Sequence, residues 1–478
     1  MQQVTSLDAQ VLNAETRSAS GHVGVLLILD PATSAGAVTL ELFRDLCQAR
    51  LHRVPRLRQR LIEVPLHLGR PYWVDDPHFD LEYHVREIGL PGAGGEHRLA
   101  ELVAGIHSRP LDQARPLWEV YLVQGIGGGR VAVYTKVHSV VIDPESGVEL
   151  LAAILDEAAE PAEPEPVERE RHPASVPSQP VLLARGVTST LSRLLTSPPR
   201  AVPHLIDLPG ASRVPGSRAV SAVADTVVSL AARRIGSGRV LERSQSAPRT
   251  TFNGALTPHR SFGYDSVPLA DIERVATAFG HPVDAVALAV TASALRRWLL
   301  DHDGLPHRPL VAAVLSPARG EDALTAADIR PLFVQLPTHL ADPEQRMAEV
   351  ARSLAAAAER VEAAVPMTTP QHSKAPTFTA LWALTCRAQF RQATVAGPAF
   401  NLFVSLVPAP RSPLYLAGAR VASVHPVSAV SDQTGGLNLG VLGYDGSLEL
   451  GVVACRELVP DIGTLISYFA DASGELAD

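Results

Sequence analysis

The sequence predicts an α/β protein of two lobes, each built on a mixed β-sheet that carries helices. Strand-like and helix-like patterns alternate in both halves of the 478-residue chain. Hydrophobic residues make up 46% of the sequence, so each half can bury a sizeable core. Glu-Pro pairs recur in residues 157–180 and favour an exposed linker. We therefore expect an N-terminal lobe at residues 1–156, a linker and crossover segment at 157–250, and a C-terminal lobe at 251–478.

The first lobe contains both kinds of periodicity. Apolar residues recur at helical spacing in residues 38–50, 99–107 and 147–157. Strand-like runs cover residues 81–85, 118–124 and 130–138. A run of three glycines, Gly127 to Gly129, separates the last two of these runs, so we predict a hairpin loop there and not a phosphate-binding loop.

The second lobe has helix-like and strand-like segments of the same kind. The helical pattern covers residues 269–279, 283–300 and 343–365, and strand-like runs cover 310–315 and a C-terminal series. Asn253-Gly254 and Asp445-Gly446 are typical hairpin turns. These elements are enough to cover one sheet with helices.

The crossover segment at 181–250 allows two interpretations. Residues 182–195 have an apolar face with Arg185 and Arg193 on the polar side, which suits a helix that lies on a lipid surface. The alternative is a solvated connection that packs over the junction of the lobes.

Composition excludes several classes of partner. A formal net charge of −8 gives a nucleic-acid partner no electrostatic support. Cys47, Cys386 and Cys455 lie far apart without metal-ligand spacing, so we expect reduced thiols and no metal site. The N-terminus has no signal-peptide pattern, and no segment reaches the roughly 20 apolar residues of a transmembrane helix. We expect a cytoplasmic protein whose membrane contact, if any, is peripheral.

The strongest chemical signal follows the strand-like run at 130–138. Residues 136–147 read Lys-Val-His-Ser-Val-Val-Ile-Asp-Pro-Glu-Ser-Gly. They resemble the acyltransferase motif His-His-x-x-x-Asp-Gly, in which His138 and Asp143 keep their spacing while Ser139 replaces the second His and Pro144 the Gly. In that motif the second imidazole takes the proton of the attacking hydroxyl group. The pattern therefore indicates an active-site position that has lost its base.

Other boxes follow in the order of the bacterial wax ester synthase/diacylglycerol acyltransferase family, which the chain resembles nearly from end to end. They are Ser6-Leu7-Asp8, Glu15, Gly21-His22-Val23-Gly24, Pro116-Leu117-Trp118, Phe252-Asn253-Gly254, His259-Arg260, Val283-Asp284-Ala285-Val286, Leu315-Ser316-Pro317-Ala318-Arg319, the stretch from Asn401 to Pro410, and Gly435-Gly436-Leu437-Asn438. Val283 stands where the family has Asn, and Leu406 and Ala409 replace another Asn and a Gly.

The resemblance implies a two-lobe architecture like that of chloramphenicol acetyltransferase and condensation domains, with a channel between the lobes. It implies acyl-CoA as co-substrate, diacylglycerol or a fatty alcohol as lipid acceptor, no bound cofactor, and contact with a membrane or lipid-droplet surface. Its site residues carry over by position. Asp143 would pair with Arg319 as a loop anchor, Pro116, Leu117 and Trp118 would be structural, and Asp284, Asn401 and Ser405 would bind substrate.

The local sequence favours structural roles over catalytic or binding roles at several of these positions. Adjacent side chains of an extended segment point to opposite faces, so His138 is a poor replacement base and fits a hydrogen-bonded core position. Ser139 has too high a pKa to be a base and lacks a Gly-x-Ser-x-Gly context. Glu145 is another proton acceptor, but Pro144 restricts the turn before it. Asp284 also suits the first turn of a helix.

Two functions are consistent with these observations. The first is O-acyl transfer from long-chain acyl-CoA to diacylglycerol or a fatty alcohol, at a rate weakened by the loss of the base. The second is a catalytically inactive paralogue that binds lipid or regulates a partner.

Overall fold

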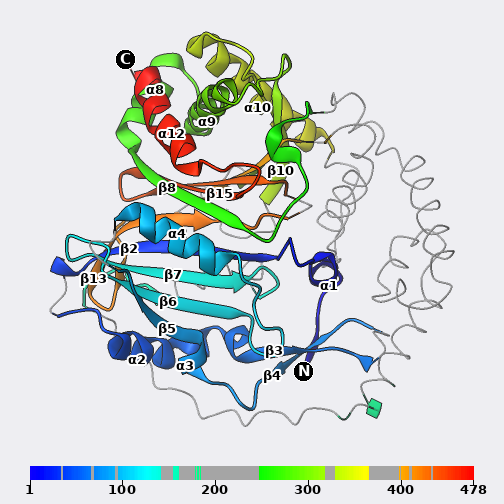
Figure 1. The fold of residues 1–478 in the computed structure, drawn as a ribbon, viewed down its shortest axis with the longest axis vertical. Helices are drawn as coiled ribbons and strands as arrows, with labels where there is room; N and C mark the ends of the chain where they lie inside the picture. Colours follow the sequence, from blue (N-terminus) through cyan, green and yellow to red (C-terminus); the bar gives the residue numbers. More distant parts are fainter. Residues whose placement is uncertain are drawn as a thin grey trace.

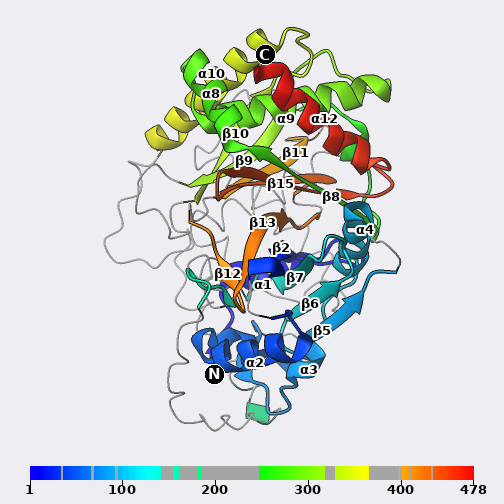
Figure 2. The ribbon, with the colours of Figure 1, turned by 90° about the vertical axis from the view of Figure 1, so that its left-hand side faces the viewer.

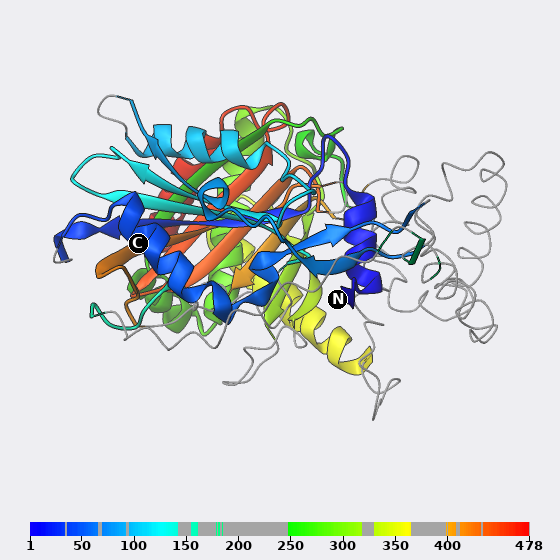
Figure 3. The ribbon, with the colours of Figure 1, turned by 90° about the horizontal axis from the view of Figure 1, so that it is seen from below.

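The described part of the chain forms two six-stranded sheets, with their strands crossing at an angle (Figures 1 and 3). The computed structural model describes residues 1–33, 36–65, 69–91, 95–141, 154–160, 178, 180–181, 184, 247–317, 329–364, 398, 400–407, 412–431 and 434–477. The mixed α/β architecture predicted from the sequence is confirmed.

The lower sheet in Figure 1 has the strand order β12-β13-β2-β7-β6-β5. Its strands are β2 (His22–Asp30), β5 (Val85–Gly89), β6 (Trp118–Gln124), β7 (Val131–His138), β12 (Tyr415–Leu416) and β13 (Ala419–Val427). Only β5 and β6 pair in parallel; the other neighbours are antiparallel. The central strand β7 is buried along its whole length, including the polar side chains of Thr135, Lys136 and His138.

The upper sheet has the order β10-β9-β11-β14-β15-β8. Its strands are β8 (Arg260–Pro268), β9 (Leu310–Pro317), β10 (Ile329–Leu336), β11 (Leu402–Val407), β14 (Leu437–Tyr444) and β15 (Ser447–Cys455). Strand β11 is parallel to both of its neighbours. Asp445 and Gly446 join β14 to β15 with φ values of 43° and 82°, as a tight hairpin turn requires, so that predicted turn is confirmed.

Helices cover the outer faces of both sheets. In the lower half these are α1 (Ser6–Ala14), α2 (Leu40–Arg50) and α3 (Leu81–His84), together with the small sheet of β1 (Gln2–Gln3), β3 (Gln59–Ile62) and β4 (Tyr72–Asp75). In the upper half they are α8 (Leu269–Phe279), α9 (Val283–Asp301), α10 (Pro343–Ala364) and α12 (Ile462–Ala477) (Figure 1). Helix α9 carries no charged residue from Ala285 to Leu295 and is buried over that whole stretch.

A third apolar cluster joins the sheets to each other. It lies beneath α4 (Glu96–His107) and combines Tyr134 of β7 with Val427 of β13 and Val453 of β15. Burial of such side chains stabilises the contact by about 1.5–3 kcal/mol each. The facing sheets therefore form a packed junction next to the end of β7.

Chain position alone does not decide which sheet a strand joins. Strand β13 belongs to the range 251–478, yet it pairs with β2 from Val427↔Gly24 to Arg420↔Asp30 and extends the lower sheet (Figure 2). The range expected to form the C-terminal lobe thus contributes strands to both sheets, because a strand takes the partner edge that buries its apolar face. The boundaries at 156 and 251 stay predictions.

Some element predictions need correction. Residues 81–85 are not a strand: the Asp80 side chain accepts a hydrogen bond from the Glu82 amide and caps the short helix α3, and strand β5 begins only at Val85. Asn253-Gly254 is not a hairpin, since Thr251–Asn253 forms a 3-10 turn. The helix expected at 147–157 lies mostly outside the described residues, and Asp156 instead pairs with Tyr415 as a β-bridge.

The remaining helix and strand predictions agree closely with the structure, including β6, α8 and α10. Cys47 and Cys455 are buried free thiols, as expected, and burial raises the pKa of Cys47 to about 12. Cys386 and the helix expected at 182–195 lie outside the described residues, apart from Ala184. No single helix of the described segments is long and apolar enough to cross a membrane; α8 and α9 pass that test only as a pair bent by 104°.

A buried carboxyl group lies at the junction of the sheets. Glu449 of β15 is 1% exposed, accepts a hydrogen bond from the Ser266 hydroxyl (2.5 Å) and lies 3.5 Å from Nδ1 of His425 in β13. Burial raises the pKa of Glu449 to about 7, with a contribution from Asp265, whereas burial lowers the pKa of His425 to about 4. The folded protein therefore keeps a proton on the carboxyl group and the imidazole neutral near pH 6.

Glu449→Gln should remove the contribution of Glu449 to the pH dependence of the protein's stability. The folded pKa of Glu449 lies above its ordinary 4.5, so its contribution to stability is complete below about pH 4.5 and is lost as the pH rises to about 7. Relative to the variant, the wild type should lose about 3 kcal/mol over that interval. His425 acts in the opposite sense in both proteins and cancels from the difference. Melting temperatures from pH 4.5 to 8 measure the effect.

Glu457→Gln, made in a His259→Ala background, provides the matched control. Hydrogen bonds from Thr257 and His259 lower the pKa of this exposed carboxyl to about 2. Because a histidine beside the carboxyl would add a pH dependence of its own, His259 is replaced in both proteins, and their difference should stay flat above pH 5. A flat difference for Glu449→Gln as well would contradict the buried, protonated state of Glu449.

Candidate active site

The motif begins where β7 leaves the ladder. The His138 amide still donates to O of Leu117, the residue before β6 (2.9 Å), and the Ser139 amide donates to O of Gly21, the residue before β2 (2.9 Å). The Val141 amide then donates back to His138 O (2.9 Å) and closes a turn. Ser139 is half-buried between two buried neighbours, His138 and Val140. The backbone of the turn is therefore held by both adjacent strands.

Both ring nitrogens of His138 are occupied. The side chain is 2% exposed; its Nδ1 accepts from the Val140 amide (3.2 Å), and its Nε2 lies 2.9 Å from Oε1 of Glu15. Because an amide N–H can only donate to Nδ1, the neutral ring carries its proton on Nε2 and donates it to Glu15. His138 has no free lone pair with which to take a proton from a substrate.

Glu15 is the partner that orients this imidazole. Its Oε1 also accepts from the Gly21 amide (2.5 Å), and its Oε2 accepts from the Gln113 side chain (3.2 Å). Burial alone would raise the pKa of Glu15, but the hydrogen bonds from His138, Gly21 and Gln113 bring it below its ordinary value. The sequence showed Glu15 only as part of the opening family block; no spacing pattern links it to residue 138.

A second group of polar side chains lies on the same face of the sheet, under α4. His22 Nε2 donates to His107 O (2.5 Å), and His107 Nδ1 accepts from the Tyr134 hydroxyl (2.8 Å). Burial lowers the pKa of His22 well below its ordinary range and that of His107 to about 3. Lys136 is fully enclosed; its Nζ donates to Ile106 O and Arg109 O, and burial lowers its pKa to about 8. These groups hold the end of α4 against β7.

The Pro-Leu-Trp box is a structural partner of the motif. Leu117 is fully buried, and its carbonyl receives the His138 amide. The Trp118 indole donates to Leu57 O (2.7 Å) and stacks on His84 at 4.5 Å between ring centroids. Pro116 is buried beside them. The box supports the strand from which the motif emerges.

The residues expected to bind substrate lie in the upper half of the molecule. Asn401 is fully buried; its Oδ1 accepts from the Val311 amide (2.9 Å) and its Nδ2 donates to Pro248 O (2.6 Å). These bonds hold Asn401 against two neighbouring segments, and its predicted role in substrate binding stays a prediction. Asp284 is exposed in the first turn of α9, and Ser405 is half-buried in β11. Asp143, Arg319, Pro144 and Glu145 lie outside the described residues, so the predicted ion pair and any role of Glu145 stay predictions.

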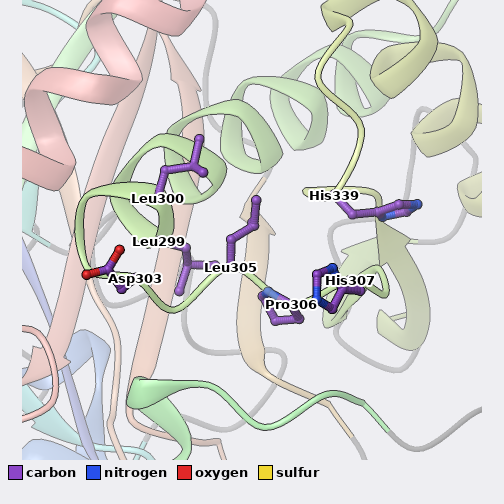
Figure 4. Close-up of a pocket in the computed structure, with 7 residues that line it drawn as sticks. All are labelled: Leu299, Leu300, Asp303, Leu305, Pro306, His307 and His339. Carbon is purple, nitrogen blue, oxygen red and sulfur yellow. The ribbon is translucent and has the colours of Figure 1, made fainter.

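Two cavities in the described part of the chain lie away from the motif. The one in Figure 4 has about 460 Å³ and lies at the end of α9, between Leu299, Leu305 and His339. The other has about 590 Å³ and lies beside the start of α2, next to Arg44 and Gln124. Neither contains His138 or Ser139, and no cluster of three metal-binding side chains occurs among the residues described.

Family comparisons agree with the order of the sequence boxes. Residues 4–287 match the wax ester synthase/diacylglycerol acyltransferase catalytic domain, and residues 328–477 match the C-terminal domain of the same family. A Mycobacterium tuberculosis protein named as a diacylglycerol O-acyltransferase is 32% identical over 482 residues, covering 100% of this chain and 90% of the relative. Another protein of that organism with the same name is 30% identical and covers 99% of both chains.

Solved structures show the same architecture. The wax ester synthase/diacylglycerol acyltransferase of Marinobacter aquaeolei VT8 is 25% identical, with a TM-score of 0.69 over 99% of this chain and 98% of that one. The starter condensation domain of rhizomide synthetase, solved with C8-CoA, is 12% identical with a TM-score of 0.55 over 100% of this chain and 94% of that domain. The condensation-domain-like fold expected from the sequence is confirmed.

Proposed function

Because the chain belongs to the wax ester synthase/diacylglycerol acyltransferase family, we propose that it transfers a long-chain acyl group from acyl-CoA to diacylglycerol or a fatty alcohol, at a weakened rate. One observation supports the weakening most directly. The amides of His138, Ser139 and Val141 are hydrogen-bonded, yet residue 139 is Ser and both nitrogens of the adjacent His138 are engaged.

The chemistry requires one proton acceptor. As the acceptor hydroxyl oxygen bonds to the thioester carbon, its proton must leave, the C–S bond breaks, and the departing CoA thiolate takes up a proton. A serine hydroxyl at residue 139 does not accept that proton at neutral pH, and His138 already donates to Glu15. Transfer then depends on holding the two substrates together, which by itself still accelerates a reaction between them.

Acyl-CoA is the proposed co-substrate. The family acts on acyl-CoA, and the condensation domain of the same fold was solved with C8-CoA. We propose that the protein reaches its lipid acceptor by associating peripherally with a membrane or lipid droplet. The apolar and arginine-bearing pattern at 182–195 supports this proposal.

A catalytically inactive paralogue that binds lipid or regulates a partner is the second candidate. The same observation at residues 138 and 139 favours it, because a retained turn without a base suits a protein that keeps its fold but not its turnover.

An assay with radiolabelled long-chain acyl-CoA decides between the two candidates. The purified protein is incubated with diacylglycerol or a fatty alcohol, the ester product is identified, and acyl-CoA binding is measured by calorimetry in parallel. The proposed function predicts a slow but protein-dependent ester product and saturable binding. Binding without product supports the inactive paralogue. The absence of both binding and product would contradict the acyl-CoA assignment.

A further inference from the structure

Arg260 lies at the start of β8 and connects the upper sheet to the loop that supports the active-site turn. The residue is 6% exposed. Its Nη1 donates to Thr257 O (2.5 Å) and His259 O (3.0 Å) within its own segment. Its Nη2 donates to Val430 O (3.2 Å), in the segment that follows β13, and to Ser18 O. One guanidinium thus joins three separate parts of the chain.

Ser18 belongs to the loop of residues 15–21, between α1 and β2. The loop is closed on itself by hydrogen bonds between Thr16 and Ala19 (2.9 and 3.3 Å). Its two ends supply the groups that hold the motif: Glu15 binds the His138 ring, and the Gly21 carbonyl binds the Ser139 amide (2.9 Å). A shift of this loop would therefore move both contacts of the turn together.

We propose that Arg260 is a positioning residue for acyl transfer: by fixing loop 15–21, it sets the placement of residues 138 and 139 when the upper sheet is docked. The part of this proposal that concerns turnover rests on the proposed function, whereas the link between Arg260 and the turn does not. The geometry also explains the choice of arginine. A planar guanidinium directs five N–H donors outward in a fixed fork, whereas a lysine ammonium is compact and carries three.

Space around the loop strengthens the proposal. A Cβ atom on Gly21 would lie 3.1 Å from Cε1 of His138 and 3.1 Å from Cγ1 of Val11. The loop is thus packed directly on the imidazole, and a displacement at Ser18 has little free volume in which to dissipate. On the other side, the Arg260 amide donates to the Ser108 hydroxyl at the end of α4 (2.9 Å), which anchors the arginine itself.

The test compares Arg260→Lys with Arg297→Lys. Arg297 lies on α9 and pairs with Asp471 at the surface, with 55% of its side chain exposed, so it provides the same substitution without a route to the turn. Hydrogen exchange is followed in residues 15–24 and 134–141, and turnover is measured in a background that carries Ser139→His and Pro144→Gly. Arg260→Lys should speed exchange in both segments and lower kcat by about 10-fold or more, with KM changed much less.

The outcomes separate the positioning role from the proposed function. Faster local exchange in Arg260→Lys without turnover in any variant supports the link to the turn and rejects the proposed activity. If Arg260→Lys shows the same turnover and hydrogen exchange as Arg297→Lys, the positioning role is overturned. A uniform rise in exchange over the whole molecule overturns it as well. Should Arg260→Lys fail to fold, Ser108→Ala is used in its place. Faster hydrogen exchange in residues 15–24 of that variant supports the proposal, and unchanged exchange there overturns it.

Discussion

Ser139→His combined with Pro144→Gly is expected to raise the rate of acyl transfer by about 10²–10⁴, the usual contribution of a positioned general base. This range corresponds to roughly 3–5 kcal/mol of activation free energy. The scaffold for such an imidazole is present, since the Leu117 and Gly21 carbonyls hold the backbone amides of residues 138 and 139 and Glu15 holds the adjacent ring. Steady-state release of CoA from long-chain acyl-CoA measures the gain.

Ser139→Gln with Pro144→Gly is the matched control for this rescue. Glutamine approaches histidine in size and polarity but does not take up a proton, so this variant should stay at the wild-type rate. Equal gains in the two variants would show that side-chain size, and not a base, limits the wild-type protein.

Gly451→Ala is expected to lower stability by about 3 kcal/mol or more, or to prevent folding. The Cβ atom would lie 1.8 Å from the carbonyl oxygen and 2.9 Å from the carbonyl carbon of Pro426, both backbone atoms of β13. A backbone clash cannot be relieved by a change of rotamer, so β13 would have to separate from β15 and open the junction between the sheets. Thermal denaturation measures the loss.

Gly443→Ala is the internal control, because no atom lies within 4 Å of the added Cβ on the neighbouring strand β14. Its melting temperature should stay close to that of the wild type. A Gly451→Ala protein as stable as Gly443→Ala would show that β13 and β15 do not pack as closely as described.

Local patterns predicted most of the elements because each depends on nearby residues. Periodicity placed β6 at Trp118–Gln124 and α8 at Leu269–Phe279. Local patterns could not predict the pairing of β13 with β2, since it joins residues about 400 positions apart and depends on which sheet edge is free. The same limit applies to Asn401, because its buried bonds to Val311 and Pro248 join segments that are far apart in the sequence.

At the candidate site, sequence spacing identified the altered motif but not the state of its histidine. Alternation along β7 indicated that His138 would not simply replace a base at residue 139. The structure shows the reason in two contacts. Glu15 accepts the hydrogen bond from Nε2, and the Val140 amide of the turn donates to Nδ1. Neither the tautomer nor the loop that holds Glu15 is encoded in the spacing of the motif.

The rate of CoA release by the wild-type protein, compared with Ser139→Ala and with the Ser139→His, Pro144→Gly variant, tests the loss of the base most directly. We predict that wild type and Ser139→Ala are equally slow and that the histidine variant exceeds both by about 10²–10⁴. Robust wild-type turnover that Ser139→Ala leaves unchanged would contradict the account and require another proton acceptor, with Glu145 the first residue to replace.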